Sequence, residues 1–228
     1  MTDIENAIAK LDHCLRGQPF DFAFLGGAVL SLLVTDPIAD TVRVTKDIDV
    51  MMNIRTRKEY HKADSLLEEL GFKHDIREGA PICRWIYDDV TVDVLPANED
   101  VLGWKSKWFA DALTEANAMV CGDHTVKVIS GPFFVALKLE AFEDRGQSDF
   151  LASTDFEDVI CLFNGRESIV DEIRECEKLR PVLAAKFGTY IQSADMEDAV
   201  EGFVQTEDNP TQRKFAILKK FKAVSELA

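Results

Sequence analysis

The sequence lacks the features that mark membrane, secreted and zinc-binding proteins. Its longest apolar run, residues 22–34, is too short to span a bilayer, and the chain opens with Asp3 and Glu5 instead of a basic segment. The 5 cysteines are scattered and contain no C-x-x-C pair, which argues against a disulfide framework and against a zinc site. We therefore expect no signal peptide, no membrane helix and a reducing, cytoplasmic location.

Positive charge is also scarce. The chain has 41 Asp and Glu residues against 26 Lys and Arg residues, which gives a formal net charge of -15. Such a field repels polyanions over about 8 Å at physiological salt, which argues against tight, nonspecific binding of nucleic acid. One local basic cluster exists at Arg55, Arg57, Lys58 and Lys62. This cluster suits a solvated helix face, and RNA contact is the alternative.

The composition is otherwise ordinary for a globular protein. The pattern of strand-like and helix-like segments changes near residue 130. Strand-like and helix-like segments alternate before this point, and helical patterns follow it. This order predicts an α+β fold, in which a mixed β-sheet core with flanking helices precedes a C-terminal helical bundle. We place the two domains at residues 1–130 and 131–228.

Capping and turn residues locate the elements. Thr2 with Glu5 and Thr56 with Glu59 form capping boxes, and Asp88-Asp89 and Gly122-Asp123 suit hairpin turns. The first part should contain a helix at 3–16, a strand at 21–25, a helix at 27–33, a strand at 42–52, a helix from 56 to 71, and then two hairpins. Further helices should open at Ser130 with Pro132, at a third capping box of Thr154 with Glu157, at Ser193, and at Asn209-Pro210.

Three aspartates interrupt apolar strands. Asp47 and Asp49 lie two residues apart in the strand "DIDVMM", so their side chains share one face at a Cα separation of about 7 Å. Asp93 lies in "VTVDVLP", which should belong to the same sheet. A solvated strand face would explain each aspartate alone. Together they indicate a carboxylate cradle for divalent metals, of the kind used in phosphoryl or nucleotidyl displacement.

Two adjacent glycines precede the aspartates. Gly26 and Gly27 break the apolar stretch "FLGGAVLSLL" between a strand and a helix. Tight packing of the strand on the helix is one explanation. The other is that backbone amides at the helix start approach a phosphate closely, aided by the helix dipole.

The motifs "FLGGAVLSLL", "VTKDIDVMM" and "VTVDVLP" together resemble the signature of the DNA polymerase beta-like nucleotidyltransferase superfamily. The resemblance is closest to small bacterial nucleotidyltransferase-like proteins, including toxins of abortive-infection type IV toxin-antitoxin systems. It extends through "KVISGPFFVALKLEAFEDRGQSDFLASTDFEDVICLF" and covers roughly residues 20–165.

The resemblance implies roles for particular residues. It implies metal ligands at Asp47, Asp49 and Asp93 for Mg²⁺ or Mn²⁺, with Asp93 also placed to help deprotonate an acceptor hydroxyl. It further implies nucleotide-binding residues at Gly26, Gly27, Lys138, Arg145, Asp155 and Asp158. Lys138 is also unusual by itself, because Phe134, Lys138 and Phe142 follow one another at helical spacing. The alternative for Lys138 is a lysine that extends its ammonium group to solvent. The alternative for Asp155 and Asp158 is that they only stabilise the helix dipole.

We expect a metal-dependent nucleotidyltransferase that moves a nucleoside monophosphate from a nucleoside triphosphate to a hydroxyl. The acceptor, an RNA end such as that of tRNA, a protein or a small molecule, stays open, as does a toxin-antitoxin role. The alternative is a non-catalytic nucleotide- or metal-binding protein that acts through a cognate protein partner. A hydrolase is a weaker option, because no water-positioning base is identifiable.

Overall fold

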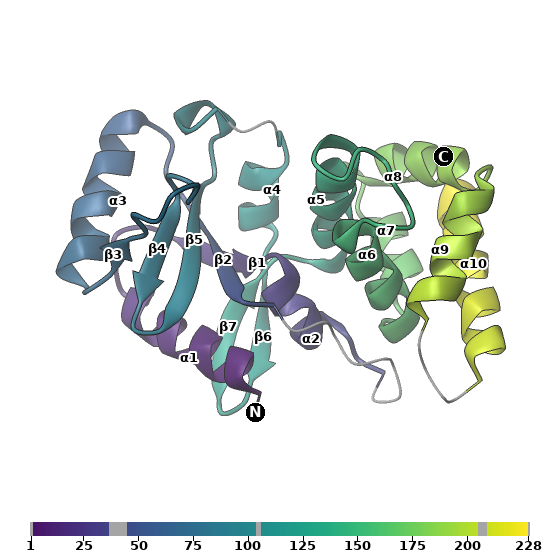
Figure 1. The fold of residues 1–228 in the computed structure, drawn as a ribbon, viewed down its shortest axis with the longest axis horizontal. Helices are drawn as coiled ribbons and strands as arrows, with labels where there is room; N and C mark the ends of the chain where they lie inside the picture. Colours follow the sequence, from purple (N-terminus) through teal and green to yellow (C-terminus); the bar gives the residue numbers. More distant parts are fainter. Residues whose placement is uncertain (1, 37–44, 104–105, 205–208, 228) are drawn as a thin grey trace. The chain divides into compact units, whose positions relative to one another are not determined.

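The computed structural model describes residues 2–36, 45–103, 106–204 and 209–227. The chain divides into two compact units. Unit 1 contains Met1–Leu32 and Val44–Ser130, and unit 2 contains Leu33–Arg43 and Gly131–Ala228 (Figure 1).

Unit 1 is built on a mixed sheet. Its strands are β1 (Phe22–Leu25), β2 (Asp47–Met52), β3 (Lys73–His74), β4 (Arg84–Tyr87), β5 (Val90–Pro96), β6 (Asn117–Cys121) and β7 (His124–Val128). Within the described residues they form a 7-stranded sheet in the order β3-β4-β5-β2-β1-β7-β6. Strands β2 and β5 are parallel, and β1 runs antiparallel to β2. The end of β1 therefore meets the first half of β2, and the start of β1 meets the end of β2.

Unit 1 contains both predicted and unpredicted helices. They are α1 (Asp3–Leu15), the 3-10 helix η1 (Gly27–Val29), α2 (Leu30–Leu33, whose last residue belongs to unit 2), α3 (Arg57–Glu69), the 3-10 helix η2 (Glu99–Val101) and α4 (Phe109–Thr114). The capping box of Thr2 and Glu5 is present at α1. At α3 the Thr56 side chain accepts from the Glu59 amide, but the Glu59 carboxylate accepts from the amide of Arg55, one residue before the cap.

Two elements near the glycines differ from their predicted bounds. The strand expected at 42–52 begins at Asp47, residues 45 and 46 are not in a strand, and residues 42–44 lie outside the described part. The helix expected at 27–33 starts as η1 and continues as α2. Gly26 before it has a φ of 75°, so the chain leaves β1 in the left-handed region and enters the tighter 3-10 turn first.

Both predicted hairpins form. Asp88-Asp89 connects β4 to β5 and Gly122-Asp123 connects β6 to β7, with positive φ at Asp88 and Gly122 as tight turns require. No sequence pattern predicts η2 and α4, because each has at most 6 residues and too few positions to show a helical period.

Unit 2 is helical. It contains α5 (Gly131–Asp144), α6 (Thr154–Gly165), α7 (Ile169–Glu175), α8 (Arg180–Tyr190), α9 (Ala194–Phe203) and α10 (Pro210–Ser225). Its core is aromatic, since Phe142, Phe156, Phe163, Phe187 and Phe221 are each fully buried. The predicted cap of α6 is wrong by one residue: Ser153 is the N-cap and accepts from the Phe156 amide, while Thr154 is already helical. Among the described residues, no helix combines the length and apolarity needed to cross a bilayer.

Candidate active site

The three predicted metal ligands lie together in unit 1. Asp47 and Asp49 are half-buried on one face of β2, while Ile48 and Val50 are fully buried on the other. Asp49 is paired in register with Asp93 on the neighbouring parallel strand β5, so both side chains leave the sheet on the same face. We call Asp47, Asp49, Asp93 and the arginine described next the carboxylate row.

Arg84 on β4 completes this row. It is the register partner of Asp93 and holds its carboxylate bidentately, with Nε to Oδ1 at 2.8 Å and Nη2 to Oδ2 at 2.6 Å. The same Nη2 donates to Asp47 Oδ2 at 3.2 Å. The hydrogen bonds that Arg84 donates to Asp93, together with the negative charges of Asp93 and Asp47, raise the pKa of Arg84 above its ordinary value, so the guanidinium stays charged. One cation thus binds two of the three carboxylates.

The absence of a side chain at Gly26 makes room for the third carboxylate, that of Asp49. A Cβ built on Gly26 would lie 1.8 Å from Asp49 Oδ2 and 2.7 Å from Asp49 Cγ. Gly26 also has a positive φ, which L side chains rarely adopt. The glycine is therefore required by the close approach of the Asp49 carboxylate and by the backbone, whether or not the turn also contacts a phosphate. Gly27 is buried at the start of η1.

The neighbouring thiol does not supply a nucleophile. Cys83 precedes Arg84 and is buried. Burial, and then the charge of Asp93, raises the pKa of Cys83 to about 12, so the thiol is protonated near neutral pH. The chemistry of this site consequently depends on carboxylates and one guanidinium.

The donor set suits a hard divalent cation. Carboxylate oxygens on adjacent strands are the ligands that Mg²⁺ and Mn²⁺ prefer, and the guanidinium of Arg84 shows that positive charge is stabilised on these oxygens. Within the described part of the chain, no group of three or more His, Cys, Asp or Glu side chains is already arranged to hold a metal. A cation at Asp93 would replace hydrogen bonds that Arg84 now makes.

The other four candidate residues form an ion-paired cluster in unit 2, in which Lys138, Asp155 and Asp158 are buried and Arg145 lies at the surface. Lys138 Nζ on α5 lies 3.0 Å from Asp155 Oδ1 and 2.6 Å from Asp158 Oδ2, both on α6. Arg145 donates to both oxygens of Asp155 at 2.8 Å. We call these four residues the buried network. The predicted aromatic neighbour is also present, since Lys138 Nζ lies 5.8 Å from the ring centroid of Phe134.

Burial and pairing oppose each other in the buried network. Lys138, Asp155 and Asp158 are 8%, 3% and 1% exposed. Burial lowers the pKa of Lys138, but the charges of Asp158 and Asp155 outweigh it and leave the pKa above its ordinary value. Burial likewise raises the pKa of Asp155, and the hydrogen bonds from Arg145 with the charge of Lys138 bring it below the ordinary value. Lys138 and Asp155 are therefore charged near neutral pH. Their nucleotide-binding role stays a prediction.

Arg84 is the residue of this site that the sequence analysis missed. A signal existed: the turn at Asp88-Asp89 fixes Tyr87 opposite Val90, and counting back along both strands places Arg84 opposite Asp93. A basic residue facing a buried aspartate across a hairpin is a strong sequence-level hint of pairing.

Comparison with solved structures gives the fold. An antigenic nucleotidyltransferase-like protein from Paracoccidioides brasiliensis aligns with a TM-score of 0.56 at 19% identity, over 91% of this chain and 95% of that one. The antibiotic-resistance factor ANT(2'')-Ia aligns with a TM-score of 0.50 at 15% identity, over 81% and 93% of the two chains. This chain has a nucleotidyltransferase-like fold. The predicted α+β fold class, a mixed sheet with flanking helices, is thereby confirmed.

Sequence comparison adds no closer relative. No protein-family model matches the chain, and no curated protein matches it. The nucleotidyltransferase-like fold is therefore known from its three-dimensional similarity, and the chemistry must be argued from the carboxylate row itself.

Proposed function

We propose that this protein is a metal-dependent nucleotidyltransferase that transfers a nucleoside monophosphate from a nucleoside triphosphate to a hydroxyl group. The observation that carries the proposal is the row of Asp47, Asp49 and Asp93 on one face of two parallel strands, with Asp49 against the Gly26 turn. A structural strand face needs neither three convergent acids nor a glycine that makes room for one of them. The nucleotidyltransferase-like fold supports the same reading.

The residues suggest a division of tasks. Asp47, Asp49 and Asp93 would hold Mg²⁺ or Mn²⁺, which supplies charge neutralisation at the triphosphate. The acceptor oxygen attacks the α-phosphorus, the bond from that phosphorus to the bridging oxygen breaks, and pyrophosphate leaves. Asp93 would take the hydroxyl proton. Both oxygens of Asp93 accept hydrogen bonds from Arg84, so Arg84 must release at least one of them first.

The acceptor and the biological process remain predictions from the sequence. An RNA end, a protein or a small molecule could supply the hydroxyl, and the net charge of -15 disfavours RNA. A toxin-antitoxin role, with a cognate protein partner, rests on the motif resemblance alone.

Label transfer tests the proposed reaction. The protein would be incubated with Mg²⁺ or Mn²⁺, each α-labelled triphosphate, and either total RNA, cell extract or a set of small hydroxyl compounds. We expect transfer that falls by at least about 1,000-fold in Asp47→Asn, because the lost charge weakens the metal site. Asp123→Asn is the matched control, since it removes one exposed carboxylate from the turn between β6 and β7. Transfer that Asp47→Asn leaves intact would remove the assignment.

One observation favours a second candidate function. Arg84 already neutralises the negative charge of Asp93 and part of that of Asp47, as a permanently bound cation would in a protein that has lost catalytic activity. Such a protein would bind a nucleotide or a metal and act through a protein partner. Saturable binding of triphosphate to the wild-type protein, with no label transferred to any acceptor fraction, would favour this candidate over the enzyme.

A further inference from the structure

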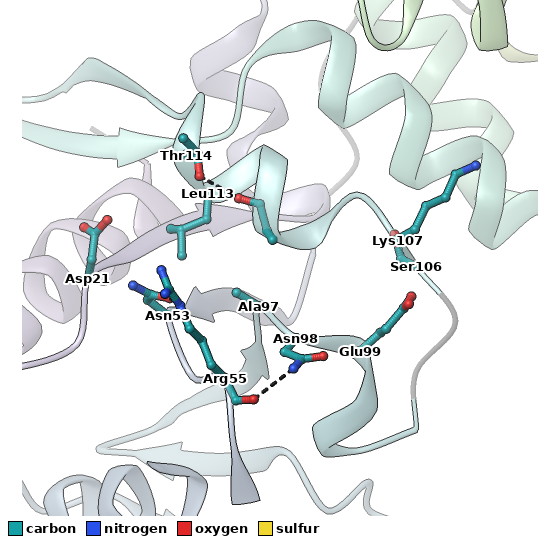
Figure 2. A pocket seen from close by; sticks show the side chains of 11 residues that line it. Asp21, Asn53, Arg55, Ala97, Asn98, Glu99, Ser106, Lys107, Leu113 and Thr114 are labelled. Atoms are coloured by element: carbon teal, nitrogen blue, oxygen red, sulfur yellow. Dashed lines mark hydrogen bonds between the residues drawn. The ribbon is translucent and has the colours of Figure 1, made fainter.

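A cavity of about 370 Å³ lies at the C-terminal ends of β2 and β5. The aspartates of the carboxylate row lie earlier on these two strands. It is lined by Asp21 before β1, by Asn53 and Arg55 after β2, by Ala97, Asn98 and Glu99 after β5, and by residues of α4 and the segment before it (Figure 2). Asn53 follows Asp49 by four residues, which is roughly 13 Å along an extended strand. The cavity is therefore separate from the proposed active site, and its volume is within the range of small-molecule sites.

Hydrogen bonds hold the polar side chains of this cavity in place. Arg55 Nε donates to Asn53 Oδ1 at 3.0 Å, which orients both side chains. Asn98 Nδ2 donates to the Arg55 carbonyl at 2.8 Å, and Asn98 Oδ1 accepts from the Asp100 amide at 3.0 Å. The loops after β2 and β5 are thus tied to each other, and the polar edge of the cavity is organised in advance of any ligand.

Some hydrogen-bond donors of these oriented side chains are available to a ligand. Among the residues that the structure describes, the terminal guanidinium nitrogens of Arg55 and the Asn53 Nδ2 have no hydrogen-bond partner. The guanidinium of Arg55 and the amide of Asn53 lie beside each other below Leu113 (Figure 2). A planar fork of donors next to an amide N–H suits the oxygens of a carboxylate or a phosphate.

The remaining lining limits the ligand. Ala97 and Leu113 are buried residues that present apolar surface to the cavity. Two acidic residues, Glu99 and Asp21, also line the cavity. Asp21 Oδ2 lies 2.8 Å from Lys127 Nζ. Two acids in the lining disfavour a highly charged anion such as a polyphosphate, while an apolar wall favours a ligand with an organic body.

We propose that this cavity is a binding site for a small organic ligand with a single oxyanion group, a carboxylate or a phosphate ester. The oxyanion is bound by Arg55 and Asn53, and the apolar part lies against Ala97 and Leu113. The proposal is independent of the transfer reaction. It also gives Arg55 a task that the other cations of its predicted basic cluster lack. All four are exposed, but Arg55 lines the cavity, whereas Arg57, Lys58 and Lys62 lie on α3 outside its lining.

NMR titration of the full-length protein with matched probes tests this site. The probes are phenyl phosphate and benzoate, which share one apolar ring and differ in the oxyanion, and inorganic phosphate, which lacks the ring. We expect saturable shifts of the Arg55 Nε and Asn53 side-chain signals with at least one ring probe, bound about 10-fold more tightly than inorganic phosphate. The ring probe that binds more tightly identifies the oxyanion.

Two variants and one control make the titration decisive. Arg55→Gln should reduce the affinity for the ring probe about 10-fold or more, and Ala110→Leu, which adds volume on the cavity side of α4, should weaken the ring probe but not inorganic phosphate. Arg57→Gln removes an exposed cation two residues away and should leave binding unchanged. The proposal is overturned if no ring probe saturates by about 10 mM, if inorganic phosphate binds as tightly, or if Arg57→Gln weakens binding as much as Arg55→Gln.

Discussion

The carboxylate row and the buried network both combine aspartates with basic side chains, but they differ in charge balance and in access. In the network, two cations face two carboxylates. Lys138 is 8% exposed, whereas the Arg145 side chain is 72% exposed. In the row, one guanidinium binds two of the three carboxylates, so the four side chains have a formal charge of 1 − 3 = −2, and the Arg84 side chain is 26% exposed. The cations and carboxylates of the network are equal in number, whereas the row has two more carboxylates than cations.

This difference separates structural from chemical tasks. Desolvated charges must be paired to be tolerated, and a paired set that is closed from water contributes specificity and rigidity more than reactivity. A row with excess negative charge near solvent costs stability unless a ligand binds it. We therefore expect substitutions in the buried network to act mainly on stability, and substitutions in the carboxylate row to act mainly on metal binding.

The largest expected effect is the loss of Lys138. Lys138→Met leaves Asp155 and Asp158 without their shared ammonium inside unit 2, and the free energy of unfolding should fall by about 3–5 kcal/mol. Urea unfolding measures it. Lys127→Met is the matched control, because Lys127 makes one exposed ion pair with Asp21 and its loss should cost less than about 1 kcal/mol. Equal losses in the two variants would contradict the structural role of the network.

The Gly26 turn should give the next largest effect. Gly26→Ala and Gly17→Ala both place a side chain at positive φ, but nothing lies within 4 Å of a Cβ at Gly17. Gly17→Ala should cost about 1 kcal/mol, and Gly26→Ala about 2 kcal/mol more from the clash with Asp49. The same additional cost in the Asp49→Ala background would show that the carboxylate is not its cause, because the double-mutant cycle isolates that contact.

Replacing Arg84 tests whether the carboxylate row binds a metal ion. Arg84→Gln removes the cation that competes for Asp93 and Asp47, so the affinity for Mn²⁺ should rise about 10-fold, as isothermal titration calorimetry would measure. Arg16→Gln is the control, since Arg16 at the end of α1 donates from Nε and Nη2 to Asp12 Oδ2 at 3.0 and 2.5 Å and does not belong to the row. An affinity that stays constant or falls in Arg84→Gln would mean that Arg84 supports the metal site.

The smallest expected effect is a change in pH dependence. The pKa of folded Asp155 lies below its ordinary value of 3.8, so its contribution to stability is present above that value and is lost as the pH falls through the folded pKa. Arg145→Gln removes the hydrogen bonds that lower this pKa. Because the Arg145 side chain is 72% exposed, the effect should stay below about 1 kcal/mol.

Urea unfolding at neutral pH and below pH 4 would measure this effect. The difference in stability between the two pH values should be smaller in Arg145→Gln than in the wild-type protein. Arg57→Gln is an exposed control outside the network and should keep the wild-type difference. An unchanged difference in Arg145→Gln would show that Arg145 does not stabilise the charged form of Asp155.

Much of the fold was predictable because its signals are local. Capping boxes, two hairpin turns and strand alternation depend on neighbouring residues, and each marked an element within a few positions. The short elements η2 and α4 and the shift of the α6 cap to Ser153 were missed, since one helical turn shows no period and two adjacent hydroxyl residues can both cap.

The candidate site was predictable in its composition and only partly in its contacts. The spacing of Asp47 and Asp49 fixes their common face, and the resemblance pointed to Asp93. Arg84 could have been found from the hairpin register. The approach of Asp49 to Gly26 could not be predicted, because it depends on the antiparallel pairing of β1 with β2, which are separated by more than twenty residues in the chain.

The sequence by itself determined which residues can carry charge or bend the backbone, since side-chain chemistry and φ preferences belong to each residue alone. The tertiary structure decided which charges meet: the parallel pairing of β2 with β5 set Asp93 beside Asp49, and the packing of α5 on α6 enclosed Lys138 between two aspartates. It also formed the cavity at Arg55 from four separate segments. These outcomes depend on long-range packing, in which the burial of apolar faces fixes the register and the distances between groups far apart in the chain.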